Sequence, residues 1–151
     1  MQFREAGISD GDSLAKIRSE VWGNEAYWKE RITGYMNCTH HPQQALMPRI
    51  IYVAIDDESI VGFIAGHLTR RYDCDGELEW VNVISNYRMG GVAFRLLKLL
   101  AAWFIQRNAH RICVDADPGN VIARNFYTKY GAVELNKHWL VWNDIRVVLA
   151  E

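Results

Sequence analysis

The segment SNYRMGGVAFRLLKLLAAWF, residues 85–104, decides the fold. It places an arginine and two adjacent glycines directly before a long apolar run, although glycine costs about 1 kcal/mol relative to alanine inside a helix. The apolar residues recur at helical spacing and predict an amphipathic helix from Gly90 to Gln106. Its apolar stripe consists of Leu96, Leu99, Leu100 and Trp103. The two glycines therefore stand where this helix begins.

The predicted helix lies between two predicted strands. The stretch ELEWVNVI, residues 77–84, precedes it, and RICVDA, residues 111–116, follows it. A strand–helix–strand crossover makes the two strands parallel. The next stretch, NVIARNFYTKYG, predicts a second helix that ends at Gly131 as its C-cap.

Upstream of these elements, the pattern predicts two helices and then an antiparallel meander. The helices cover residues 9–22 and the region from Asn24 onward, and residues 38–49 are predicted to form a loop because of Pro42 and Pro48. Strands are expected over 50–55 and 60–69, and the Asp75–Gly76 pair predicts a turn over residues 73–76 because it tolerates positive φ. Strands this close in sequence usually pair with their neighbours.

The whole chain, residues 1–151, is therefore expected to form one α/β domain with a mixed sheet flanked by helices. The last twenty residues predict one or two strands with a turn near Asn136, or a short helix after Asp144. The segment Trp139–Trp142 could form the edge of a homodimer. In open sheets, ligands bind at the carboxyl ends of parallel strands, which here means residues 85–91 and 117–120.

Composition excludes several classes of protein. Half of the residues are apolar and the net charge is −1, so the sequence shows no footprint for nucleic acid. No signal peptide is recognisable, and the longest apolar run, residues 96–105, is too short to span a membrane. Three widely spaced cysteines argue against a disulfide framework and favour a reducing compartment. We therefore expect a cytoplasmic protein.

The glycines indicate an anion-binding site. The N-terminus of a helix has unpaired N–H groups and partial positive charge, and small residues let an anion reach them. Gly90, Gly91 and Ala93 leave that approach open, and Arg88 adds a charge suited to phosphate. The alternative is a tight turn that uses glycine for its conformation alone. The spacing fits neither a P-loop nor a dinucleotide-binding loop.

At this point the sequence resembles the GNAT superfamily of N-acetyltransferases. The stretch RMGGVA fits its (Gln/Arg)-x-x-Gly-x-(Gly/Ala) signature through Arg88, Gly91 and Ala93. The stretch NVIARNFYTKYGA is similar to the family's Asn-x-x-Ala-x-x-(aromatic)-Tyr-x-x-x-Gly helix, with Asn120, Ala123, Phe126, Tyr127 and Gly131 in register. Ser85 stands where many members have proline. The resemblance is weakest over residues 22–48 and after Lys137.

The resemblance implies an acyl-CoA ligand, most often acetyl-CoA, and no metal. Its pyrophosphate would bind the N–H groups of the segment formed by Met89, Gly90, Gly91, Val92 and Ala93, with Arg88 beside it. The pantetheine arm would pair with the backbone at Val83 and Ile84, and Asn120 would contact the arm near its middle. Tyr127 would face the thioester sulfur. The acceptor pocket would be lined by Trp28, His40, His41 and Gln44.

The implied chemistry is direct attack by a primary amine of a small molecule or peptide. Freeing such an amine, with a pKa of about 10.4, costs about 4.6 kcal/mol at neutral pH. Glu77 and Glu79 alternate onto one side of their strand. Glu79 is the first candidate for the base and Glu77 the second, because a bulge in this strand would change which of them faces the cleft. Tyr127 could protonate the leaving thiolate, and the backbone amide of Val83 or Ile84 could stabilise the oxyanion.

Other interpretations stay open beside this one. The two glutamates could be ordinary surface charges, and the chain could be a non-catalytic acyl-CoA-binding sensor or interaction module. His67, Cys74 and the CTHH stretch fit no standard zinc spacing, and Cys113 lies within an apolar strand, where a thiol would be inert. The acidic stretch before Trp80 fits a cationic acceptor, such as an aminoglycoside, polyamine or basic peptide, or a solvated hairpin.

Overall fold

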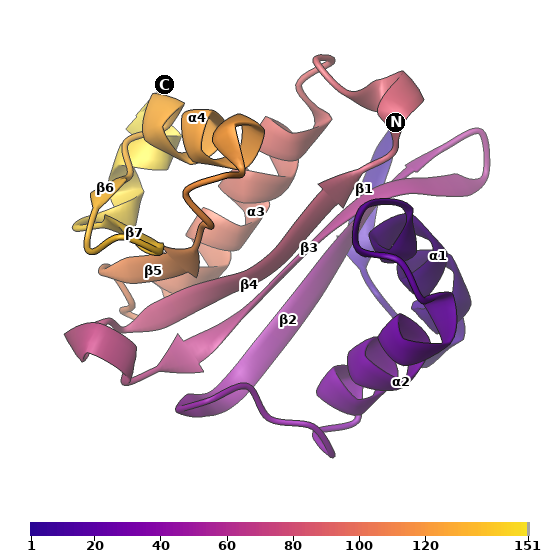
Figure 1. Ribbon diagram of the computed structural model, residues 1–151, viewed down its shortest axis with the longest axis horizontal. Helices are drawn as coiled ribbons and strands as arrows, with labels where there is room; N and C mark the ends of the chain where they lie inside the picture. The colour runs from indigo at the N-terminus through magenta and orange to yellow at the C-terminus, as the bar shows by residue number, and fades with distance from the viewer. Residues whose placement is uncertain (151) are drawn as a thin grey trace.

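The computed structural model describes residues 1–150 as a seven-stranded sheet with helices on both faces (Figure 1). The strand order is β1-β2-β3-β4-β5-β7-β6. The strands are β1 (Gln2–Glu5), β2 (Ala45–Asp56), β3 (Ser59–Thr69), β4 (Gly76–Val83), β5 (Ile112–Asp115), β6 (Val133–Glu134) and β7 (Trp139–Trp142). The α-helices are α1 (Gly11–Trp22), α2 (Glu25–Met36), α3 (Val92–Gln106) and α4 (Val121–Lys129). Short 3-10 helices cover Ile8–Asp10, Arg71–Asp73, Ser85–Tyr87 and Ile145–Ala150.

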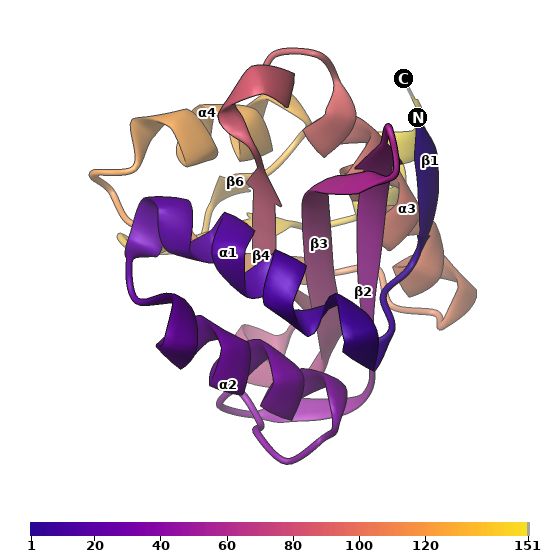
Figure 2. The same ribbon diagram turned by 90° about the vertical axis from the view of Figure 1, so that its right-hand side faces the viewer.

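The two faces of the sheet carry separate hydrophobic cores. Helices α1 and α2 cover one face, and α3 with the C-terminal 3-10 helix covers the other (Figures 1 and 2). Strand β3 contributes side chains to both hydrophobic cores, because successive side chains of a strand point to opposite faces of the sheet. Phe63 and Ala65 pack into the core under α1 and α2, whereas Ile64 packs into the core under α3. This arrangement confirms the predicted single α/β fold with a mixed sheet.

The change from antiparallel to parallel pairing occurs at β4. Strands β1 to β4 pair antiparallel in sequence order, and β4 pairs parallel with β5 over only three residue pairs, from Gly76–Ile112 to Leu78–Val114. Beyond Leu78 the two strands no longer pair. Helix α3 makes the crossover between them, as predicted, and begins at Val92 rather than Gly90. The divergence opens the sheet at the carboxyl ends of its parallel strands.

Two expectations about local structure need correction. The loop predicted up to Arg49 ends earlier, because β2 begins at Ala45 and accommodates Pro48 at a register shift, where the missing N–H costs no ladder hydrogen bond. The predicted turn near Gly76 takes its positive φ at Tyr72 and Asp73 instead. Strand β1 has no counterpart in the predicted elements. At the C-terminal end both predicted features occur, because β6 and β7 flank the region of Asn136 and a 3-10 helix follows Asp144.

The predicted dimer edge at Trp139–Trp142 is wrong, because that segment is not an edge. Strand β7 lies between β5 and β6 and is paired on both sides. All four of its residues are buried.

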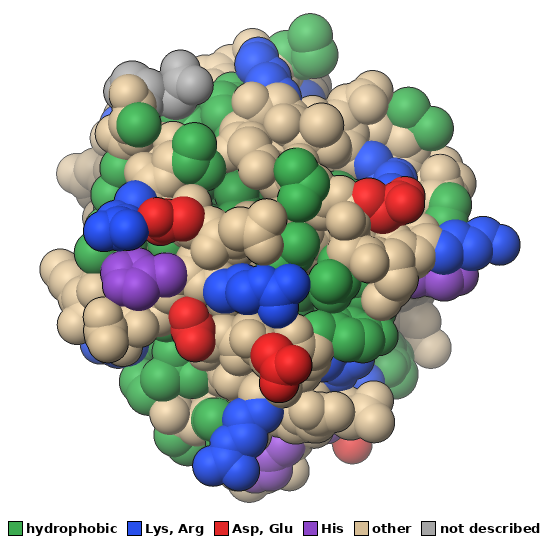
Figure 3. All heavy atoms as spheres, turned by 90° about the vertical axis from the view of Figure 1, so that its left-hand side faces the viewer, with side chains coloured by type: hydrophobic (Ala, Val, Ile, Leu, Met, Phe, Trp, Pro, Cys, Tyr) green, Lys and Arg blue, Asp and Glu red, His purple; other side chains and the backbone are tan. Residues whose placement is uncertain are grey.

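The molecular surface mixes charges of both signs. On the face shown in Figure 3, acidic and basic side chains alternate with apolar and uncharged surface rather than gathering by sign. None of the helices within residues 1–150 combines the length and apolar character that crossing a membrane requires.

Candidate active site

The link from β4 to α3 leaves a run of backbone donors unpaired. None of the N–H groups of residues 89–93 makes a well-formed hydrogen bond to a described residue. The segment is exposed from Arg88 to Gly91, and the Nε of Arg88 donates to the carbonyl of Val83 at 3.0 Å. Val92 is the first residue of α3 and packs its side chain into the core, and its amide points along the helix axis toward the N-terminus. Unpaired amides at a helix N-terminus beside an arginine form a site suited to an anion.

The two glycines of this segment have different explanations. Gly91 has a φ of 83°, a conformation that favours glycine, so the fold itself requires it. Gly90 has no such φ, and a Cβ at this position would meet only the Tyr87 carbonyl oxygen at 3.5 Å. Fold geometry therefore explains Gly91 but not Gly90. The missing side chain at Gly90 leaves open space next to the segment that carries the unpaired amides.

The open edge of β4 offers one of the two predicted backbone positions. The Ile84 N–H donates to the Val61 carbonyl at 2.9 Å, and the Ile84 carbonyl accepts from the Tyr87 N–H at 3.0 Å. The expectation that Ile84 offers a free amide is therefore wrong. Because successive residues of a strand point their N–H groups to opposite edges, the Val83 amide faces the gap between β4 and β5.

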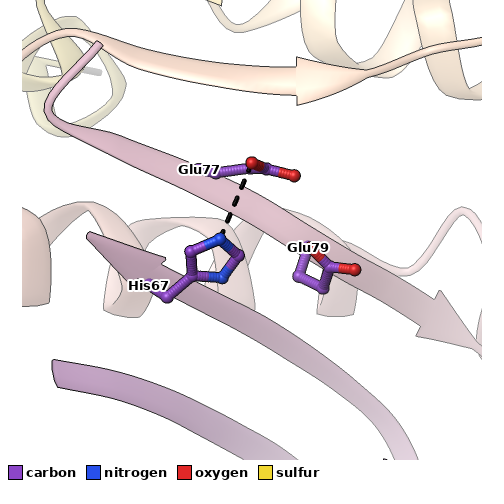
Figure 4. A group of neighbouring side chains, drawn as sticks. All are labelled: His67, Glu77 and Glu79. Carbon is purple, nitrogen blue, oxygen red and sulfur yellow. Dashed lines mark ion pairs between the residues drawn. The ribbon is translucent and has the colours of Figure 1, made fainter. Parts of the chain in front are cut away.

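The two predicted glutamates lie on the same side of the sheet, beside His67 of β3 (Figure 4). One ligand atom from each of the three side chains lies within 4.8 Å of the other two. Glu77 is 4% exposed, and its Oε1 is 3.3 Å from Nε of Arg71 and 3.6 Å from Nε2 of His67. Figure 4 marks the His67–Glu77 contact. The interpretation of both glutamates as surface charges is therefore wrong for Glu77.

A β-bulge at Glu79 sets the direction of these side chains. The pairing of β4 with β3 shifts between Trp80–Ala65 and Leu78–Gly66, so Glu79 has no partner in β3. Leu78 consequently packs under α3, whereas Trp80 packs under α1 and α2. Without the bulge, these two residues would share one face.

Burial changes the acidity of this group. Burial raises the pKa of Glu77 to about 7, and the Arg71 charge opposes that rise. Burial and the charge of Glu77 raise the pKa of Glu79 to about 7 as well. On the other side of the group, burial lowers the pKa of His67 to about 4, and its Nδ1 lies 2.9 Å from the Tyr35 hydroxyl. A carboxylate with a pKa near 7 is matched to accepting a proton at neutral pH.

The same three side chains form the only group of metal-ligand type within residues 1–150. Arg71 already supplies a positive charge to Glu77, and such a charge opposes the binding of a cation at the same oxygen. We interpret the group as a proton-sharing cluster rather than a metal centre. Cys113 is fully buried, and burial beside Cys74 raises its pKa, consistent with an inert thiol.

Tyr127 of α4 is buried at the other side of the cleft. Its ring packs edge-on against Trp142, with centroids 5.7 Å apart. Burial raises the pKa of its hydroxyl, and the nearby charge of Arg18 opposes that rise. Arg18 comes from α1, so the cleft brings together residues from opposite ends of the chain. Asn120 forms the N-cap of α4, and its Oδ1 accepts from the Ala123 N–H at 3.2 Å.

The acceptor pocket formed by the four predicted residues stays a prediction. Trp28 packs edge-on against Trp80, with centroids 6.0 Å apart, and so lies next to the bulge. Among the other three, the His41 Nδ1 is 2.8 Å from Nη2 of Arg49, and the backbone carbonyls of His40 and Gln44 accept from Nη1 of Arg49 and from the Thr69 hydroxyl.

Sequence patterns did not reveal two residues of this site. Arg18 occupies an ordinary helical position, and Arg71 follows a strand among several charged residues. Both acquire their importance only when α1 and the β3–β4 connection fold against β4. No local motif marks either residue.

Comparisons with known proteins agree with this geometry. The family model described as "Acetyltransferase (GNAT) family" matches residues 12–132. A search of curated protein sequences gave no significant match. Among solved structures, PaiA N-acetyltransferase from Thermoplasma acidophilum in complex with coenzyme A is 16% identical, with 93% of this chain and 95% of that chain covered and a TM-score of 0.73.

Two further solved structures have the same fold. Aminoglycoside 6'-acetyltransferase type Ii is 22% identical, with coverages of 96% and 97% and a TM-score of 0.75. An aminoglycoside 6'-N-acetyltransferase complexed with coenzyme A is 20% identical, with coverages of 93% and 96% and a TM-score of 0.69. Because the family model spans most of the sequence, this chain belongs to the GNAT family of acetyltransferases.

Proposed function

We propose that this protein transfers the acetyl group of acetyl-CoA to a primary amine of a small molecule or peptide. The observation that carries the proposal is the run of unpaired amides at residues 89–93, which follows the strand that carries Glu79. Two structures of similar fold are complexes with coenzyme A, which supports the same ligand here. The three cysteines are free, which fits the cytoplasmic location expected from the sequence.

In this proposal, donor binding depends mainly on the backbone. The diphosphate binds the unpaired amides of residues 89–93, and Arg88 turns from the Val83 carbonyl toward it. The pantetheine arm lies in the gap that opens after Leu78, where the Val83 amide faces it. Asn120 contacts the arm through its side-chain NH₂, because its Oδ1 is occupied by the Ala123 amide.

The reaction begins with removal of a proton from the acceptor. Glu79 accepts a proton from the ammonium group, directly or through water, and its pKa of about 7 leaves it partly ionised at neutral pH. The resulting amine nitrogen then attacks the carbonyl carbon of the thioester, and the carbonyl electron pair moves onto oxygen. The Val83 amide is positioned to donate to that oxyanion.

Collapse of the tetrahedral intermediate completes the transfer. The carbonyl forms again, the carbon–sulfur bond breaks, and the thiolate takes a proton from the Tyr127 hydroxyl. The nitrogen loses its second proton to solvent, which also returns a proton to Tyr127 and removes one from Glu79. The balance is one ammonium ion and one acetyl-CoA converted to one amide, one free thiol of coenzyme A and one proton.

Thiol release from acetyl-CoA with a panel of primary amines tests this function. The proposal predicts release with at least one amine class, a product heavier by one acetyl group, and a loss of kcat in Tyr127→Phe of about tenfold or more. Tight binding of acetyl-CoA by calorimetry with no release for any amine at any pH would instead support a non-catalytic acyl-CoA sensor. Absence of binding would exclude both functions.

A further inference from the structure

Arg18 is a charged side chain without a charged partner. It donates one hydrogen bond, from Nη1 to the Asn82 side-chain oxygen at 2.9 Å, although a guanidinium has five N–H donors. Its Nε is buried and has no partner, and it forms no ion pair with any described carboxylate. Its Cζ lies 4.7 Å from the ring centroid of Trp28 and 5.3 Å from that of Trp22.

A purely structural role does not explain this arrangement well. Burying an ion away from water is unfavourable unless hydrogen bonds or an opposite charge compensate for it. Burial lowers the pKa of Arg18 to about 10, which shows that the compensation is incomplete. Arg71, in contrast, contacts Glu77, and Arg4 forms two hydrogen bonds with Asp10. Arg18 therefore retains unused capacity to bind an anion.

The position of Arg18 places that capacity inside the reaction cleft. The charges of Tyr127 and Glu79 both act on the guanidinium, so it lies near the two residues proposed to handle protons. Its hydrogen-bond partner Asn82 is on β4, one residue before the Val83 amide. Trp22, whose ring lies beside the guanidinium, is half exposed.

The acidic stretch before Trp80 is less available for a cationic acceptor than its composition indicates. The Asp75 carboxylate accepts from the backbone N–H groups of His110 and Arg111, both at 2.9 Å. Glu77 is buried against Arg71. Of the carboxylates in this stretch, Glu79 is the one whose charge acts on Arg18 in the cleft. The cleft thus presents one carboxylate and one unpaired guanidinium to the acceptor.

We propose that Arg18 binds a carboxylate of the acceptor, so that the acceptor is an amino acid or a similar small molecule with an amine and a carboxylate close together. This inference rests on the proposed acetyltransferase function and deepens it. Glu79 would attract the ammonium group of such a zwitterion, and the fork of the guanidinium would hold its carboxylate through two parallel N–H donors. Trp22 and Trp28 would keep the fork in place.

Matched pairs of acceptors test this inference. Thiol release from acetyl-CoA is measured with each of the standard amino acids and with the corresponding carboxamide, at a pH where the amine of each pair is equally ionised. We expect kcat/KM for at least one amino acid to exceed that of its carboxamide about tenfold or more. Arg18→Gln should abolish this preference by raising KM for the amino acid, with acetyl-CoA affinity unchanged. Arg18→Lys, which keeps the charge but loses the fork, should retain part of it.

The control is Arg31→Gln, which removes a guanidinium that packs on the Tyr27 ring of the same helical pair. It should leave the preference intact. Equal use of carboxylates and carboxamides by the unmodified protein would overturn the inference even if no Arg18 variant folds. If Arg18→Gln lowers kcat equally for the amino acid and for its carboxamide, the inference is also overturned, because the guanidinium would then act on the acetyl oxygen. No thiol release with any amine, including amines without a carboxylate, would overturn the acetyltransferase proposal itself.

Discussion

The two walls of the cleft are built in different ways. The wall proposed to bind the donor consists mainly of backbone, the amides of residues 89–93 and the Val83 amide, with the side chains of Arg88 and Asn120 beside them. The wall proposed to bind the acceptor consists of side chains from α1, α2, β3 and β4, and many of them are charged and buried. A backbone site depends on conformation, whereas a side-chain site depends on tertiary packing.

This difference has a consequence for the effects of mutation. On the donor side, a change affects the ligand chiefly through the space that a new side chain takes up. On the acceptor side, a change leaves a buried partner uncompensated, so it alters both the chemistry and the pH dependence. The following predictions test that contrast.

The largest effect is expected for Glu79→Gln. Loss of the proton acceptor should lower kcat by about a hundredfold or more, with acetyl-CoA affinity unchanged, as measured by steady-state kinetics and calorimetry. Glu30→Gln on the exposed surface of α2 is the matched control and should behave like the unmodified protein. If Glu79→Gln keeps most of its kcat while Glu77→Gln loses it, the assignment of the two carboxylates must be reversed.

A smaller effect is expected for Gly90→Ala. The added Cβ fits the folded chain, because its nearest contact is at 3.5 Å and φ is ordinary, so the melting temperature should not change. The methyl group would nevertheless lie over the unpaired amides, and acetyl-CoA should bind about tenfold more weakly in calorimetry. Gly7→Ala, at another exposed glycine with open space, is the control. Unchanged affinity in Gly90→Ala would mean that the ligand does not approach this residue.

The pH dependence of catalysis should report the buried carboxylates. The pKa values of about 7 predict that kcat/KM rises with pH and levels off above about 7, at the same position for acceptors of different amine pKa. Arg71→Gln removes the charge that favours ionised Glu77, so Glu77 stays protonated to a higher pH and its charge no longer raises the pKa of Glu79. The rise should therefore move about one pH unit lower. Arg70→Gln, at the neighbouring exposed arginine, should not move it. A rise that follows the amine of each acceptor would contradict the assigned base.

The smallest effect concerns stability. The folded chain holds the protons of Glu77 and Glu79 up to a pH of about 7, whereas the unfolded chain releases them near their usual pKa of about 4.3. The free energy of unfolding should therefore fall as pH rises through that window. His67 acts in the opposite sense, since its folded pKa of about 4 makes stability rise with pH up to its unfolded value of about 6.5.

Two carboxyls outweigh one imidazole, so the net fall in the free energy of unfolding should be about 4 kcal/mol in urea denaturation. In Glu77→Gln, the contributions of one carboxyl and one imidazole oppose each other, so the free energy of unfolding should depend little on pH. A slope that is the same in the variant and the unmodified protein would show that burial does not raise the pKa of Glu77.

The same contrast explains what the sequence could predict. The crossover from β4 through α3 to β5 follows from local periodicity and from glycine positions, so it was predictable. Helix α4 was predictable as well, although its C-cap is Tyr130 and Gly131, with a φ of 107°, is the residue after it. The proposed donor site could also be predicted from the sequence, because a backbone site leaves a local sequence pattern at Arg88, Gly91 and Asn120. The residue-by-residue assignments on that site stay predictions until a ligand is placed.

The acceptor side was only partly predictable, for physical reasons. The bulge at Glu79 depends on how β4 meets β3, and no local pattern marks it. Arg18 and Arg71 become important only through contacts with distant elements. His41 and Arg49 form a hydrogen bond with each other, and a sequence cannot show that a polar residue is already paired.

The central claim is that the amides of residues 89–93 bind the diphosphate of coenzyme A. Calorimetry with acetyl-CoA and with acetyl-pantetheine, which has the same thioester and arm but no diphosphate, tests it most directly. We predict that acetyl-CoA binds at least about a hundredfold more tightly than acetyl-pantetheine. Gly90→Ala should reduce this difference in affinity by weakening the binding of acetyl-CoA alone. Equal affinity of the unmodified protein for the two thioesters would contradict the claim.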